Sequence, residues 1–356
     1  MGALRYVGIL LWFAGIAASI ALVAWSGLDD VGDALAAAGA AGLAGAVLVR
    51  VVTVSVAGAG WWLLFPAAPP LRLGTAVLLR FVREGVNALL PFTQVAGDVI
   101  GARLLTFFAV PGPLAAASVI VDMLMQAATQ FVFTALGLMA LIVCGTGSSV
   151  PVTAATSLAV AAPLLLGFYV VQRRFGHRIL HGVLSRIGGD GSWRVLGTVD
   201  AVYQGLAAIY ARRRGLAASG AVHLAGWLAG VAEVLIVLRC MGLPATLGEA
   251  LVIESLVQAV RGAAFAVPSA LGAQEGALIL LCGLFQIPAD QALALSFIKR
   301  AADVAVGVPS LVVLQILEGR RFTAGWLRRG GPSAAVPRVM PQVASQVVPH
   351  VSLERD

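Results

Sequence analysis

The stretch EGVNALLPFTQVAGD, residues 84–98, places acidic, amide and proline residues inside an otherwise apolar region of the chain. Of the 356 residues, 60% are hydrophobic and only 12% are charged, a composition far from that of a soluble domain. We therefore expect an integral membrane protein. An ionisable side chain at membrane depth costs about 2.5–3.5 kcal/mol on insertion scales, so this stretch must interrupt a membrane segment for a structural or functional reason.

The apolar runs around this stretch predict membrane helices. They are rich in Ala, Leu, Val and Gly and lack the alternation of barrel strands. The predicted fold class is an all-α polytopic membrane protein. Full spans are expected at residues 6–25, 34–65, 114–144, 150–171, 216–241 and 290–316, and interrupted segments at 75–108 and 251–287.

Arginines indicate the orientation of these spans. Loop 66–74, loop 172–215 and the tail carry arginines, whereas loops 26–33, 145–149 and 242–250 have no basic residue. The positive-inside rule then puts both termini and residues 172–215 in the cytoplasm. This assignment requires each interrupted segment to enter and leave by one face, as a re-entrant pair of half-helices or as two short crossings. The short arms favour re-entrant elements, because a full span needs about 20 residues.

The predicted organisation is one membrane bundle and one tail. Residues 1–318 form the bundle, with six full spans plus two re-entrant broken-helix elements. Within it, residues 172–215 alternate arginine with apolar residues and suit amphipathic helices at the cytoplasmic interface. Residues 319–356 contain several prolines and are expected to be a disordered cytoplasmic tail.

The two interrupted segments have prolines, acids and aromatic residues at matching positions when their residue numbers are aligned at one constant offset. The prolines, acids and aromatic residues that match are Pro91 and Pro268, Asp98 and Glu275, Phe108 and Phe285, and Pro111 and Pro288. Because the loop charges give the two segments opposite orientations, this match predicts an inverted repeat. Inverted repeats with broken helices are typical of secondary transporters.

Polar residues recur at helical spacing around both interruptions and in the spans that follow them. The candidate binding residues of the first segment are Arg80, Arg83, Glu84 and Asn87 before the break at Pro91, and Gln94 and Asp98 after it. Those of the second segment are Glu254, Gln258 and Arg261 before the break at Pro268, and Gln274 and Glu275 after it. The following spans add Asp122, in a stripe with Gln126 and Thr129, and the pair Lys299 and Arg300.

Two interpretations of this polarity stay open. In the structural one, the charges pair with one another and the acids cap their half-helices. The pairs expected are Arg80 with Glu84, Glu254 with Gln258 or Arg261, and Lys299 with Asp303. In the functional one, the residues line a path for a lipid headgroup. Arg50 and Glu233, alone in their spans, are expected as interior partners or as snorkelling ends.

Other kinds of site find little support in the sequence. The four histidines and three cysteines show no metal-ligand spacing, and neither a phosphate-binding loop nor a nucleic-acid-binding motif is present. We therefore expect no metal, no cofactor and no nucleic-acid partner.

The quoted stretch also carries a resemblance. RFVREGVNALLPFTQVAGDVIGARLL, and later ESLVQAVRGAAFAVPSALGAQEGALILL, resemble the membrane domain of the lysylphosphatidylglycerol synthase/flippase family, and within it the hopanoid-biosynthesis-associated members. The resemblance covers about residues 5–318. A typical member has glycine where this chain has Ser269.

The resemblance implies a bacterial inner-membrane flippase or transporter. Its partners would be the membrane and a lipid substrate, a hopanoid or phospholipid, and a homo-oligomer is compatible with it. Some members add a soluble aminoacyl-transferring domain, and nothing after residue 318 resembles one. Enzymatic activity is therefore not expected. The alternatives are a lipid-modifying membrane enzyme using Asp98, Asp122 or Glu275, and a scaffold for hopanoid enzymes.

The predicted orientation is testable by cysteine labelling. In a background without the three native cysteines, cysteine at Ser148 should react with an impermeant thiol reagent in intact cells, because loop 145–149 is expected outside. Cysteine at Ser192 or Ser333 should react only after permeabilisation. Labelling of Ser192 in intact cells would contradict the orientation.

Overall fold

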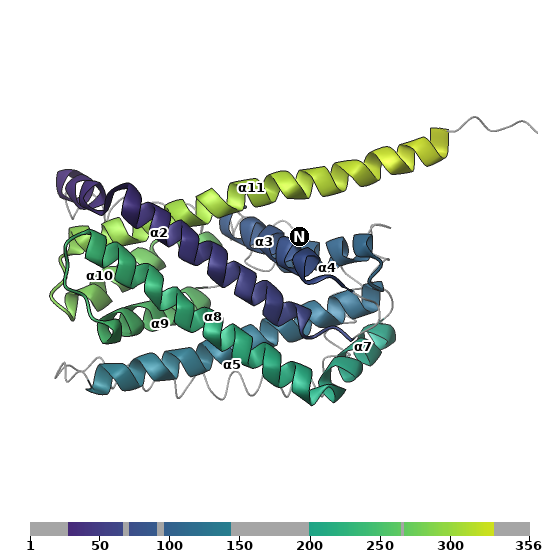
Figure 1. Ribbon diagram of the computed structural model, residues 1–356, viewed down its shortest axis with the longest axis horizontal. Coiled ribbons are helices and arrows are strands. Elements are labelled where there is room, and N and C mark those ends of the chain that lie inside the picture. Colours follow the sequence, from purple (N-terminus) through teal and green to yellow (C-terminus); the bar gives the residue numbers. More distant parts are fainter. Residues whose placement is uncertain (1–27, 67–70, 91–95, 144–198, 265–266, 331–356) are drawn as a thin grey trace, which may run out of the picture. The chain divides into compact units, whose positions relative to one another are not determined.

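The computed structural model describes residues 28–66, 71–90, 96–143, 199–264 and 267–330. These residues form helices and no strand, in the order α2 (Leu28–Trp62), α3 (Leu73–Leu89), α4 (Ala96–Leu105), η1 (Thr106–Phe108), α5 (Gly112–Val143), α7 (Val199–Ala211), α8 (Arg213–Cys240), α9 (Leu247–Ala263), η3 (Pro268–Ala270), α10 (Ala273–Gly283) and α11 (Ala289–Gly330) (Figure 1). The predicted all-α fold class is confirmed for this part of the chain.

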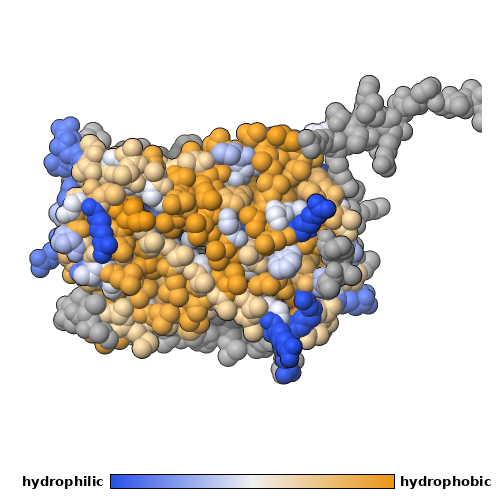
Figure 2. All heavy atoms as spheres, viewed as in Figure 1, coloured by the Kyte–Doolittle hydropathy of each residue, from blue (hydrophilic) through white to orange (hydrophobic). Residues whose placement is uncertain are grey.

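Four described helices are long and apolar enough to cross a membrane: Asp29–Trp62, Gly112–Ile142, Arg213–Cys240 and Ala289–Gly319. They match four of the six predicted spans. The other two, 6–25 and 150–171, lie outside the described residues, as do Pro91 and Gln94. Large apolar side chains on the four helices are exposed, among them Leu48, Met139, Leu228 and Val308, and the face shown in Figure 2 is mostly hydrophobic. The protein is a multi-pass membrane protein.

Each interrupted segment consists of two short helices. The first gives α3 and α4, and the second gives α9 and α10. Each pair lies between two long helices, so α2-α3-α4-α5 and α8-α9-α10-α11 have the same order of lengths. The structure therefore contains two repeats of one helical pattern.

The repeats also share one turn. Ala109 and Gln286, which align at the same offset as the matching prolines, both have positive φ, 61° and 59°. Beside them, Val110 N–H donates to the Leu105 carbonyl at 3.4 Å, and Ile287 N–H donates to the Cys282 carbonyl at 3.1 Å. This left-handed residue with its 6→1 bond is the Schellman helix end, after which a proline is common. It explains why Pro111 and Pro288 match.

The second break is strained and anchored to the first repeat. Ser269 and Ala270 in η3 have φ of 54° and 48°, in the left-handed region that favours glycine. The hydroxyl of Ser269 donates to the carbonyl of Ala88, at the end of α3, at 2.6 Å. The second break therefore lies against the end of the first arm of the other repeat.

Two boundaries differ from the sequence prediction, and α7 adds a packing contact. Residues 28–33 are the first turns of α2 and not a loop, since aspartates stabilise a helix N-terminus. Helix α11 continues to Gly330, beyond the predicted boundary at 318, because Pro332 is the first strong helix breaker there. In α7, the apolar residues Val202, Leu206 and Ile209 are buried, and Gly205 lies against Pro113 and Ala117 of α5. The apolar face of α7 therefore packs against α5, and the position of this helix relative to a lipid interface stays a prediction.

Gly97 provides a test of the α3–α4 hairpin. A Cβ there would lie 2.2 Å from the backbone carbonyl oxygen of Arg83, which cannot move without shifting α3. We expect Gly97→Ala to lower the melting temperature and folded yield strongly in detergent. Gly276→Ala in α10 is the control, because no atom lies within 4 Å of its Cβ position. Equal effects of both substitutions would contradict the close α3–α4 contact.

Candidate functional site

Three groups of polar side chains lie inside the bundle. The first cluster contains Arg80, Arg83, Glu84, Asn87, Asp98, Asp122, Gln126 and His223. The second cluster contains Arg50, Glu233, Glu254, Gln258, Arg261, Lys299 and Asp303. The third cluster contains Ser269, Gln274, Glu275, Ser296 and Arg300.

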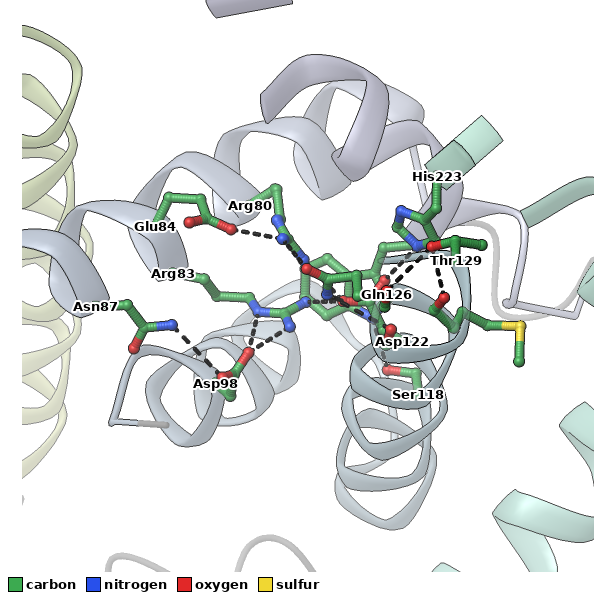
Figure 3. Close-up of polar contacts among 12 residues, drawn as sticks. Arg80, Arg83, Glu84, Asn87, Asp98, Ser118, Asp122, Gln126, Thr129 and His223 are labelled. Carbon is green, nitrogen blue, oxygen red and sulfur yellow. Dashed lines mark hydrogen bonds and ion pairs between the residues drawn. The ribbon is translucent and has the colours of Figure 1, made fainter. Parts of the chain in front are cut away.

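Asp122 of α5 is the centre of the first cluster and is fully buried (Figure 3). Its Oδ2 lies 2.8 Å from Nη1 of Arg80 and 2.8 Å from Nη1 of Arg83. The same oxygen accepts a hydrogen bond from Nε2 of Gln126 at 2.8 Å. Oδ1 lies 3.1 Å from Nε2 of His223 on α8. Asp122 thus joins α3, α5 and α8.

Arg83 connects Asp122 to the second arm of the first broken segment. Its guanidinium pairs with Asp98 in the first turn of α4 and lies 4.4 Å from the centre of the Trp61 ring. Asn87 Oδ1 accepts a hydrogen bond from the Gly97 N–H at 2.7 Å, which satisfies a donor at the start of α4. Asp98 therefore holds Arg83, and Asn87 provides the cap.

Lys299 is the centre of the second cluster, also fully buried. Its Nζ lies 2.9 Å from Oε2 of Glu254 and 3.3 Å from Oε2 of Glu233. The other oxygen of Glu254 accepts from Nε2 of Gln258 at 2.7 Å. The predicted pair of Glu254 with Gln258 is present, as is that of Arg80 with Glu84 at 2.5 Å.

The predicted pair of Lys299 with Asp303 is wrong. Asp303 instead pairs with Arg50 of α2 at 2.9 Å and lies 3.8 Å from Arg261. Arg50 also lies 3.8 Å from Glu233, so both lone charges are interior partners. Asp303 and Lys299 thus both pair with residues of other helices, since a buried charge needs a close opposite charge.

The third cluster fixes α10 to α11. Glu275 Oε1 accepts from Nε of Arg300 at 2.6 Å and from the Ser296 hydroxyl at 3.1 Å. Its Oε2 accepts from the Gly272 N–H at 2.8 Å, which caps α10 as expected. Gln274 donates to Ser296 at 2.8 Å. These contacts hold α10, the helix that follows the second break, against α11.

The two main pairs are equivalent in the repeats and opposite in sign. Asp122 and Lys299 occupy equivalent positions, because both follow the start of a long helix by the same distance. Arg80 and Glu254 are likewise equivalent, since they lie equally far from the starts of α3 and α9. Thus Arg80 with Asp122 in one repeat corresponds to Glu254 with Lys299 in the other.

A cavity of about 240 Å³ lies between the first and second clusters. Its charged lining residues are Arg50, Arg80, Arg261, Glu84, Glu233 and Glu254. Its other polar and aromatic lining residues are Thr53, Gln126, Gln130, His223, Trp227 and Gln258. The cavity lies well inside the spans. Its lining residues Arg80 and Glu254 contact Asp122 and Lys299, respectively. Asp122 and Lys299 each lie ten residues after the start of a 31-residue span, which corresponds to about 15 Å along the helix.

Some of the predicted site residues line this cavity, and others lie outside its lining. Arg80, Glu84, Glu254, Gln258 and Arg261 line it. The remaining described candidates lie outside the lining: Arg83, Asn87, Asp98, Asp122, Gln274, Glu275, Lys299 and Arg300. The acids of the two break regions are paired with Arg83 and Arg300. Arg50 and Glu233, which were expected as interior partners or as snorkelling ends, also line the cavity. Sequence reasoning missed His223, whose signal was a histidine within an apolar span.

One family model matches the chain. It is described as the lysylphosphatidylglycerol synthase TM region and matches residues 12–310. No curated protein and no solved structure gives a significant match.

The buried pair of Glu254 and Lys299 can be tested by a double-mutant cycle. Lys299→Met leaves two carboxylates without their common cation, which should cost roughly 3–5 kcal/mol of stability. Adding Glu254→Gln removes one of these charges and should restore part of the loss. The measurement is the melting temperature of each variant in detergent. Additive losses in the double variant would contradict a direct coupling.

Proposed function

The chain belongs to the lysylphosphatidylglycerol synthase transmembrane-region family, and on that premise we propose that it is a lipid flippase or transporter of a bacterial inner membrane. The headgroup of the lipid passes through the cavity while its apolar part stays in the bilayer. The substrate is a hopanoid or a phospholipid. The observation that carries this proposal is the cavity lined by charged residues, deep within the spans.

The size and polarity of the cavity support this function. Pockets for whole drug-sized ligands have volumes of about 300–1,000 Å³, so a cavity of about 240 Å³ suits a headgroup better than an entire lipid. A charged headgroup cannot cross hydrocarbon without a large solvation penalty. Side chains of both signs, already held by partners, replace part of its hydration.

The proposed topology follows from the repeat. The pairs α3–α4 and α9–α10 are re-entrant elements of an inverted repeat, with six full spans and both termini in the cytoplasm. Transporters of this kind bind substrate near the midplane at the interface of their repeats. The cavity is lined by α3 of one repeat and by α9 of the other, which supports the same arrangement here.

The contacts of three acidic residues favour a transport function without covalent chemistry. Asp98, Asp122 and Glu275, the acid/base groups of the alternative hypothesis, each accept bonds from arginine. A residue that transfers a proton must lie within hydrogen-bond reach of its substrate, whereas none of these three residues lines the cavity.

Filling the cavity provides the test. Gly230 of α8 lines it, and a Cβ there meets only Oε1 of Glu254, at 3.7 Å. We expect Gly230→Leu to abolish leaflet exchange of a tail-labelled phospholipid or hopanoid in proteoliposomes, with a melting temperature near wild type. Gly220→Leu in the same helix is the control, because its Cβ position has no atom within 4 Å and it is not a lining residue.

Two results would contradict the proposal. Lipid exchange by Gly230→Leu at the rate of Gly220→Leu would exclude the cavity as the route. Chemical conversion of the lipid by wild-type protein, without a change in its leaflet distribution, would favour the enzyme.

A further inference from the structure

The charges that line the cavity balance. Three are arginines, Arg50, Arg80 and Arg261, and three are glutamates, Glu84, Glu233 and Glu254. With histidine counted as neutral, the formal sum over the lining is zero. Behind the lining, Arg83 lies between Asp98 and Asp122. Lys299 contacts Glu233 and Glu254 of the lining. Asp303 contacts Arg50 and Arg261 of the lining. The formal charges of these five residues behind the lining sum to a single negative charge. The site therefore has no large surplus of either sign.

The balanced lining limits the net charge of the ligand that the cavity can hold. Charges interact strongly in a low-dielectric interior, so a ligand with a net charge must find an opposite charge that is not already paired. A balanced lining gives such a ligand no surplus counter-charge. A ligand that carries one anionic and one cationic group can instead insert between the paired side chains without leaving a net charge buried.

The lining contains unpartnered donors and one unpartnered acceptor. Within the described residues, Nε and Nη2 of Arg50 have no hydrogen-bond partner but lie beside the ion-pair partners Asp303 and Glu233. In the described part of the chain, Nε of Arg80 and Oε1 of Glu233 also have no hydrogen-bond partner, although both residues are less than 5% exposed. An unsatisfied buried polar group costs about 1–3 kcal/mol or more. A ligand group that forms a hydrogen bond with either atom therefore gains binding free energy. These two atoms come from different walls, α3 and α8.

We propose that the cavity selects zwitterionic headgroups, with the anionic group beside Arg80 and the cationic group beside Glu233 and Glu254. An amine-bearing phosphodiester has this chemistry. The inference rests on the proposed lipid transport and adds the substrate class. The same chemistry exists in soluble glycerophosphodiesters, so the experiment must separate the two sources.

The experiment compares two tail-labelled lipids in one vesicle composition. Proteoliposomes of phosphatidylcholine and phosphatidylglycerol contain a trace of fluorescent phosphatidylethanolamine or fluorescent phosphatidylglycerol, and leaflet exchange is followed by quenching with dithionite. We expect wild-type protein to exchange the zwitterionic lipid about tenfold faster than the anionic one, since one uncompensated charge in a buried site is worth at least that factor.

Two mild substitutions should shift this preference in opposite directions. Glu84→Gln removes a carboxylate whose side chain is 40% exposed and gives the lining a net positive charge, so the phosphatidylglycerol rate should rise relative to phosphatidylethanolamine. Arg261→Gln removes a guanidinium that is 21% exposed and should lower the phosphatidylglycerol rate further. Asp33→Asn and Arg239→Gln change exposed charges outside the lining and should leave the ratio unchanged.

The outcomes distinguish this inference from the proposed function. Equal exchange of both lipids by wild type, or a ratio that neither lining variant changes, overturns zwitterion selection while transport stands. No exchange of any lipid overturns the proposed function. Uptake of radiolabelled glycerophosphoethanolamine that Gly230→Leu blocks, without lipid exchange, supports the selectivity and identifies a soluble zwitterion as its source.

Discussion

The burial of Asp122 is the constraint on which the first repeat depends. A fully buried carboxylate is tolerated only with close, hydrogen-bonded partners, and its partners come from α3, α5 and α8. Arg83 then needs a second acid, which α4 supplies by folding back after the break. Lys299 imposes the same requirement on the second repeat, where Glu254 and Glu233 arrive from α9 and α8. Ion pairing thus determines which helices must meet, while lipid-facing apolar residues determine only that they are helices.

Sequence predicted the four described spans, the two interrupted segments and their shared pattern, because prolines, apolar runs and polar spacing are local signals. It could not predict the pairing across the repeats. The second break is longer than the first, so the offset that aligns α3 with α9 is smaller than the one that aligns α4 with α10. The single offset that matches the prolines pairs Arg80 with Val257 and hides its equivalence to Glu254. Contacts such as Asp122 with His223 depend on tertiary packing, which no spacing in the sequence encodes.

The second break shows how strain is held in place. Two successive left-handed residues that are not glycine cost of order 1–3 kcal/mol each, and Ser269 and Ala270 adopt this conformation together. Ser269 is fixed on both sides, because its hydroxyl donates to Ala88 and its carbonyl accepts from Arg300. Arg300 in turn is paired with Glu275. The third cluster therefore stabilises a strained backbone and leaves the first and second clusters to line the cavity.

The reversed signs of the two repeats keep like charges from facing each other across the cavity. If equivalent positions carried the same residue, Arg80 would be matched by a second arginine at position 254, and both line the same cavity. Two like charges in a low-dielectric space repel strongly and would attract permanent counter-ions. An acid at position 254, backed by Lys299 where the first repeat has Asp122, makes the two halves attract and keeps the lining neutral. The same reversal gives the cavity one positive and one negative wall residue at equivalent positions, so that a dipolar group has one preferred orientation inside it.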